Sequence, residues 1–170
     1  MTFRLIGAVL VAAGGAWIGF QAAASLRRRV QALREMADGL AVLERELELN
    51  APPLPRLLAW GAVHSQGPAL VLFEGCIQGL NNLAQEDFSS LWRRLVGEQE
   101  GLGRAGQALL SPLGDTLGRY DATQQRERIS ALRHRLEELA TRLEEDSRRQ
   151  GRVYQALGLS GGAFLVILLL

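Results

Sequence analysis

The side chains best suited to catalysis are few in this chain and lie far apart in the sequence. His64 and His134 are its two histidines, and Cys76 is its single cysteine. They form no HExxH pattern and no paired-cysteine spacing, the arrangements that hold a catalytic or structural zinc ion. His64 lies beside Ser65, but no third group within sequence reach completes a triad. We therefore expect no enzymatic activity and no metal or other cofactor.

The basic residues exclude two further classes of function. All 19 are arginine, and they are balanced by 18 acidic residues. A Walker-type loop needs a lysine to reach the β- and γ-phosphates, so this chain cannot hydrolyse nucleotide by that design. The nearly neutral charge also lacks the basic surface of a nucleic-acid-binding domain. Any energy source must come from a partner.

A cluster of acids is the first candidate for binding a partner. Glu44, Glu46 and Glu48 alternate with other residues in one predicted helix, and we expect all three to be exposed. Such clusters are usually solvated faces that form pairs with arginines four residues away. The alternative is a docking patch for a basic partner.

The segment 114–121 is the second candidate. Gly114 and Gly118 permit left-handed backbone, and loops held by rigid helices often carry recognition. Asp121 is also a strong candidate for a helix N-cap, with Gln124 reaching back as in a capping box. The structural alternative is that the glycines end one helix and Asp121 caps the next.

These candidates lie between two uncharged apolar segments, residues 5–24 and 153–170. A helix rises 1.5 Å per residue, so about 20 apolar residues cross a hydrocarbon core of about 30 Å. We expect two membrane spans, with domain boundaries at 1–25, 26–152 and 153–170. A cleaved signal peptide is the competing interpretation of the first segment. Its basic cluster would precede a shorter apolar core, whereas here the cluster follows.

Arginine placement predicts the orientation of the central domain. Residues 27–29 follow the first span, and Arg148, Arg149 and Arg152 precede the second. Basic residues next to a span tend to remain in the cytoplasm. We therefore expect a two-span protein of the cell membrane whose central domain is cytoplasmic and whose termini are both outside.

Both predicted spans contain glycines four residues apart. These are Gly15 and Gly19 in the first span, and Gly158 and Gly162 in the second. This spacing lets helix backbones approach closely in lipid. It fits equally well with the two spans pairing with each other or with another membrane subunit.

The central domain is predicted to be all-α, a bundle of about six helices. Apolar residues recur at alternating spacings of three and four in 33–47 and 129–143, which is typical of a coiled-coil-like stripe. The first helix should stop near Asn50, before a proline cluster. We expect both long helices to continue into the spans and to pair antiparallel. The stripes are either the core of this chain or a zipper to another chain.

Shorter helices should pack onto this pair. We expect a second helix from Pro53 or Pro55, a third from Gly67, and a fourth from about Asp87 that ends before the glycine-rich stretch 101–106. A fifth, short helix holds Leu109, Leu110 and Leu113, with Leu117 as a further candidate. Cys76 falls in the apolar pattern of the third helix and is expected to be a small core residue.

Several local strings, in order between two terminal spans, resemble the stage III sporulation protein AB family along essentially the whole chain. They are LEREL at 43–47, Pro53-Leu54, Trp92, LGDTLGRYD at 113–121 with Gln125 beyond, and Leu157-Gly158 with Gly161-Gly162. The chain departs from the family pattern at Leu47-Glu48 and at Arg119-Tyr120. These departures leave the fold intact and bear on which face docks a partner.

The resemblance implies a membrane-anchored adaptor of a secretion-like channel complex, located in the mother-cell membrane facing the forespore. Its soluble domain would be similar to the cytoplasmic helical domain of the type II secretion platform protein. The implied partners are a secretion-type ATPase of the same sporulation system and other channel membrane proteins. The main alternative is a self-oligomerising platform scaffold without a dedicated sporulation role. A membrane enzyme acting at the lipid interface is disfavoured because no nucleophile is paired with a base.

Overall fold

The computed structural model describes residues 2–80, 87–118 and 121–169, with the side chains of Gln21 and of residues 24–148 among them. Across these ranges the secondary structure consists of six α-helices and two 3-10 helices, without a strand. The predicted all-α class and the expected number of about six helices are confirmed.

The chain divides into two compact units. The central unit comprises residues 28–141, and the terminal unit comprises residues 1–27 and 142–170. Among the described residues, no helix is long and apolar enough to cross a membrane. The predicted spans, residues 5–24 and 153–170, lie almost entirely outside the residues whose side chains are described. The same holds for their four glycines, Gly15, Gly19, Gly158 and Gly162.

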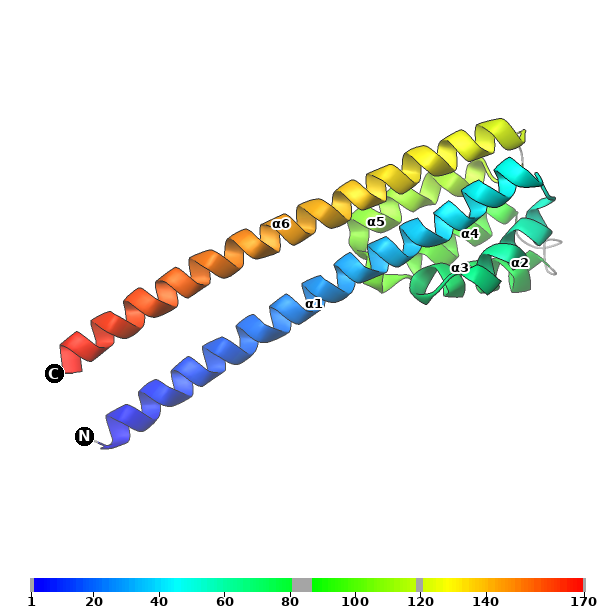
Figure 1. The fold of residues 1–170 in the computed structure, drawn as a ribbon. Coiled ribbons are helices and arrows are strands. Elements are labelled where there is room, and N and C mark those ends of the chain that lie inside the picture. Colours follow the sequence, from blue (N-terminus) through cyan, green and yellow to red (C-terminus); the bar gives the residue numbers. More distant parts are fainter. Residues whose placement is uncertain (1, 81–86, 119–120, 170) are drawn as a thin grey trace. The chain divides into compact units, whose positions relative to one another are not determined.

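Two long helices begin and end the chain, α1 (Thr2–Leu49) and α6 (Ala122–Leu169), and each is one continuous helix of 48 residues. The first ends next to the predicted stop, because Ala51 adopts a positive φ of 42° and prolines follow. In the central unit α1 and α6 lie side by side (Figure 1). Ion pairs join Glu44 to Arg133 and Glu48 to Arg126, so the two helices run antiparallel there, as predicted.

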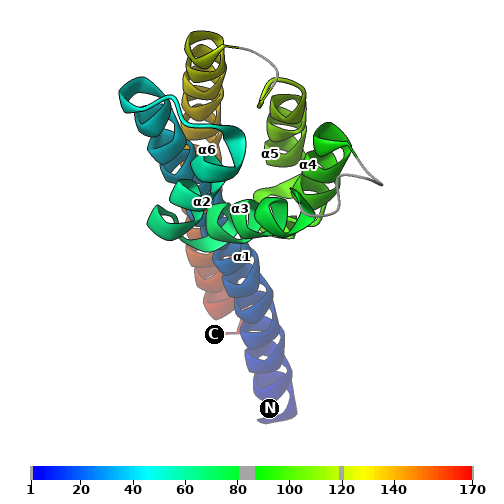
Figure 2. The ribbon, with the colours of Figure 1, turned by 90° about the vertical axis from the view of Figure 1, so that its right-hand side faces the viewer.

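Three of the short helices begin where the sequence predicts. They are α2 (Leu54–His64), with Pro55 in its first turn, α3 (Gly67–Leu80) and α4 (Phe88–Gly97). Figure 2 shows these helices and α5 packed beside the two long helices in the central unit.

The fourth helix ends at Gly97, before the glycine-rich stretch 101–106, as predicted, and α5 (Gly103–Leu110) starts inside that stretch, directly after the 3-10 helix η1 (Glu100–Leu102). The prediction for the fifth helix is wrong at its end. The helix stops before Leu113, which lies instead in the 3-10 helix η2 (Ser111–Asp115). Pro112 lacks the N–H group that would continue the α-helical ladder, which explains the change.

The apolar stripes form the core of the central unit. Leu33, Met36, Leu40, Leu43, Ile129 and Leu136 are fully buried, together with Trp92, Phe73 and Cys76. The apolar stripe of α1 packs closely against the short helices. A Cβ added at Gly61 of α2 would lie 2.6 Å from Leu43 Cδ2, and one at Gly106 of α5 would lie 2.8 Å from Leu33 Cδ2. Within the central unit, this stripe therefore packs against helices of its own chain.

Candidate partner-binding site

The three acids of the predicted docking patch do not share one exposed surface. Glu46 is only 8% exposed, and Asn50 Nδ2 donates a hydrogen bond to Glu46 Oε1 at 2.9 Å. The expectation that Glu46 is exposed is therefore wrong. Residues two apart point to different sides of a helix, and Glu46, three residues after Leu43, lies on the side of the buried stripe.

The other two acids bind arginines of α6. Arg133 Nε donates to Glu44 Oε2 at 3.0 Å, and both side chains are 23% exposed. Arg133 Nη1 also donates to Glu137 at 2.8 Å. The hydrogen bond with Glu44 is the main cause that raises the pKa of Arg133 above its ordinary value. Glu44 thus connects α1 to α6 and is poorly placed to receive a partner.

Glu48 retains an accessible carboxylate. It pairs with Arg126 Nη1 at 3.1 Å, but its side chain is 59% exposed. An exposed pair of this kind contributes roughly 0 to 1 kcal/mol and exchanges readily with other charges. Of the three predicted acids, Glu48 is the one whose position fits a partner contact, which stays a prediction.

Gly114, in the second candidate segment, is a packing residue. It is buried in η2, where a Cβ would lie 2.7 Å from Trp92 Cδ1, and its φ is not positive. Gly114 therefore does not adopt the left-handed backbone that glycine permits. The indole of Trp92 is fixed from the same side, because its Nε1 donates to the carbonyl oxygen of Leu110 at 2.9 Å.

Gly118 and Asp121 behave as the structural alternative predicts. Gly118 has a left-handed φ of 76°, and its N–H donates to Gln125 Oε1 at 3.4 Å. Asp121 Oδ1 accepts from the amide of Gln124 at 2.8 Å, so Asp121 caps α6. The return bond of a capping box, from Gln124 to the Asp121 amide, is absent between these two described residues. Residues 119–120 lie outside the described ranges.

A polar cluster that the sequence did not reveal joins α4 to η2. Ser89 Oγ donates to Asp115 Oδ1 at 2.6 Å, and Arg93 Nη2 donates to the same oxygen at 2.9 Å. Ser89 is buried, whereas the Arg93 and Asp115 side chains are about half exposed. The cluster fixes the start of the segment 114–121, so these residues are held by structural bonds on both sides.

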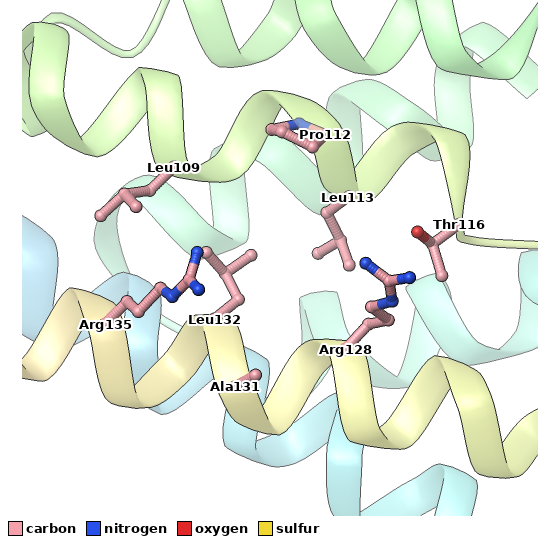
Figure 3. Close-up of a pocket in the computed structure, with 8 residues that line it drawn as sticks. All are labelled: Leu109, Pro112, Leu113, Thr116, Arg128, Ala131, Leu132 and Arg135. Carbon is pink, nitrogen blue, oxygen red and sulfur yellow. The ribbon is translucent and has the colours of Figure 1, made fainter.

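A groove also lies between α6 and the α5–η2 segment (Figure 3). Neither candidate from the sequence, the acidic cluster or the segment 114–121, predicted it. Its cavity has a volume of about 160 Å³. The lining residues are Leu109, Pro112, Leu113, Thr116, Arg128, Ala131, Leu132 and Arg135. Figure 3 shows the guanidinium groups of Arg128 and Arg135 reaching from α6 towards the opposite wall, one at each end, with Leu132 between them.

The residues first considered for catalysis occupy unrelated places. His64 stacks on Trp60 with ring centroids 4.1 Å apart, and His134 Nδ1 lies 3.5 Å from Glu137 on the surface. Burial raises the pKa of the Cys76 thiol to about 12. Where the structure describes side chains, no group of three or more His, Cys, Asp or Glu residues is placed to hold a metal ion.

Comparisons with known proteins agree on one family. The family model for stage III sporulation protein AB matches residues 4–170. Stage III sporulation protein AB of Bacillus subtilis (strain 168) is 24% identical over 170 residues, covering 98% of this chain and 99% of the relative. A solved structure of stage III sporulation protein AB (SpoIIIAB) has a similar fold, with a TM-score of 0.60 at 21% identity, covering 71% of this chain and 97% of the solved chain.

Proposed function

Because this chain belongs to the stage III sporulation protein AB family, we propose that it is a membrane-anchored adaptor in a secretion-like channel complex between mother cell and forespore. In this role it docks a secretion-type ATPase at the membrane and contacts other membrane proteins of the channel. The role is structural, and the chemical energy comes from the partner. This proposal deepens the sporulation role that family membership supports.

The observation that carries the proposal is the pairing of two apolar segments with a charged helical unit in one chain. Residues 5–24 and 153–170 have the length and composition of membrane spans. The central unit has its own buried core and joins α1 to α6 by ion pairs. A unit of this kind can present a folded surface to a cytoplasmic partner. The lack of lysine assigns nucleotide hydrolysis to that partner.

The proposed location is the mother-cell membrane facing the forespore, with the central unit in the cytoplasm. The arginines at 27–29 and near Arg148 support this orientation through their bias towards the cytoplasmic side. A docked ATPase would then have access to cytoplasmic ATP.

Affinity capture tests the role. The tagged full-length protein is recovered from sporulating cells in mild detergent, and the co-purifying proteins are identified by mass spectrometry. We expect a secretion-type ATPase and membrane proteins of the channel. Recovery of the protein alone, as a defined oligomer, would instead favour the self-oligomerising platform scaffold.

A single charge reversal tests the acidic contact within the same experiment. Glu46 is buried and Glu44 is a half-buried partner of Arg133, so reversing either charge would damage the fold. Glu48→Arg changes an exposed carboxylate, and Glu127→Arg on α6 is a matched control at another exposed glutamate. Loss of the ATPase with Glu48→Arg alone would assign the contact to Glu48. Equal capture by both variants would remove Glu48 from the docking surface.

A further inference from the structure

The groove between α6 and the α5–η2 segment has two features that together specify a ligand. Its apolar lining comes from both walls, with Leu113 and Leu132 buried and Leu109 partly exposed. Its two ends carry arginines that are exposed and form no ion pair with any described residue. Every residue that lines it belongs to the central unit.

The unpaired state of these arginines distinguishes them from their neighbours on the same helix. Arg126 pairs with Glu48, Arg133 pairs with Glu44 and Glu137, and Arg148 pairs with Glu144. Arg128 and Arg135 instead point across the groove (Figure 3). A guanidinium group presents several donors in a fixed fork that matches a carboxylate.

We propose that this groove binds an acidic amphipathic helix of a partner protein, with an apolar side chain seated between two carboxylates. The inference deepens the proposed adaptor function, on which it rests, by assigning the docking surface. The two unpaired arginines at the ends of the groove favour an acidic ligand through charge complementarity. The apolar walls decide against a lone phosphate group or a lipid headgroup, which would leave Leu109, Pro112 and Ala131 in contact with water.

The spacing of the arginines defines the ligand. Residues 128 and 135 are seven apart on one helix, so their Cα atoms are separated by about 10 Å along its axis on the same face. A partner helix that lies along α6 would match them with two glutamates seven residues apart. The residues three and four positions after the first glutamate would then face the cavity. A volume of about 160 Å³ accommodates one or two leucine-sized side chains of this kind.

The inference is tested with three synthetic helical peptides of about 15 residues. The first carries Glu at positions i and i+7 and Leu at i+3 and i+4. The second replaces both glutamates by lysine, and the third replaces both leucines by glutamine. Each fluorescently labelled peptide is titrated with the purified full-length protein in non-ionic detergent, and binding is followed by anisotropy. We expect the first to bind and the other two to bind at least about tenfold more weakly.

Variants of the protein locate the site. Arg128→Glu and Arg135→Glu should each weaken binding of the first peptide about tenfold, and Ala131→Trp should weaken it by filling the cavity. Arg56→Glu on α2 is the matched control, since Arg56 is exposed and also lacks an ion pair with any described residue. The double variant Arg128→Glu/Arg135→Glu should gain affinity for the lysine peptide, which a misfolded protein would not do.

Two outcomes would contradict the inference that the groove binds an acidic amphipathic helix. One is equal binding of the glutamate peptide and its leucine-free form, which would indicate general charge attraction. The other is an equal loss of affinity with Arg56→Glu. Capture from sporulating cells separates this inference from the adaptor function. If the double arginine variant recovers the same partner proteins as wild type, the ATPase included, the groove inference fails while the adaptor role stands. If the peptide binds but wild type recovers no ATPase, the adaptor role fails.

Discussion

Trp92 is fully buried and lies against the backbone of Gly114, where only a hydrogen atom fits. Its indole nitrogen is bonded to Leu110, so the ring cannot retreat without losing a buried hydrogen bond. Any larger side chain at position 114 must displace either the ring or η2. Packing, and not backbone conformation, therefore requires glycine here.

Gly114→Ala should lower the free energy of unfolding by about 1 to 3 kcal/mol through overpacking. Thermal unfolding of the full-length protein, followed by circular dichroism, measures the effect. Gly97→Ala is the control, because a Cβ at position 97 meets nothing within 4 Å. That variant should be unchanged or slightly more stable, by up to about 1 kcal/mol. Equal melting of the two variants would contradict the packing role of Gly114.

Cys76 should be chemically inert in the folded protein. Desolvation by burial raises the pKa of its thiol to about 12, and its side chain has no exposed surface. The thiolate is the reactive form, and at pH 8 to 10 it is almost absent from the folded state. We expect alkylation by iodoacetamide in this pH range only after denaturant is added. Rapid labelling of the native protein at pH 8 would show that the α3 region opens frequently.

Among the helices, α1 and α6 are joined by two ion pairs of different exposure. The Glu44–Arg133 pair is 23% exposed on both sides, whereas the Arg126 and Glu48 side chains are 39% and 59% exposed. Water screens the second pair more strongly. A double-mutant cycle with alanine should therefore give a coupling energy of about 1 kcal/mol or more for Glu44–Arg133 and less than about 0.5 kcal/mol for Glu48–Arg126. The reverse order would mean that the first pair does not connect the helices.

The start of α6 depends on Asp121. Asp121→Ala removes the acceptor for the Gln124 amide and should cost about 0.5 to 2 kcal/mol of stability. Asp121→Asn keeps an oxygen acceptor at the cap and should retain most of that stability. Melting and partner capture are measured together on both variants. Lost capture of the ATPase with unchanged melting would show that Asp121 also contacts the partner.

The periodicity of apolar residues predicted the helices and their buried faces well, but the exposure of individual polar residues less well. The spacing of apolar residues at 33–47 and 129–136 identified the buried faces of both long helices, because a helical period directly defines a face. Further along the second stripe, Leu139 and Leu143 are partly exposed. The same argument, applied to Glu46, would have placed it near Leu43 and away from the surface. The fourth helix ends before the glycine-rich stretch 101–106, as predicted, whereas α5 begins inside it, because glycine weakens a helix without forbidding one.

The groove could not be derived from local sequence. Its walls, 109–116 and 128–135, belong to separate elements, and their apposition depends on how α5 and η2 pack. The local signal is a pair of arginines seven residues apart around Ala131 and Leu132. Such a pair is common on helices, and only the structure shows that both lack an acidic partner among the described residues.

At the scale of the whole molecule, the two units divide the proposed role between anchoring and docking. The terminal unit contains the apolar segments 5–24 and 153–170, and the central unit contains Glu48 and the arginine-lined groove. Each docking feature requires that the central unit face the compartment that holds the ATPase. Membrane orientation is therefore the property on which both proposed contacts depend.

Cysteine labelling tests this orientation, because the native chain has no accessible cysteine that would react with the label. Cys76 is its single cysteine and is buried, so a membrane-impermeant maleimide should not label the wild-type protein. A cysteine placed at the exposed position of Glu127 should be labelled only after protoplasts are lysed, since the flanking arginines predict a cytoplasmic central unit. A cysteine replacing Thr2 should be labelled in intact protoplasts. Labelling of Glu127→Cys before lysis would place the central unit outside and exclude docking of a cytoplasmic ATPase.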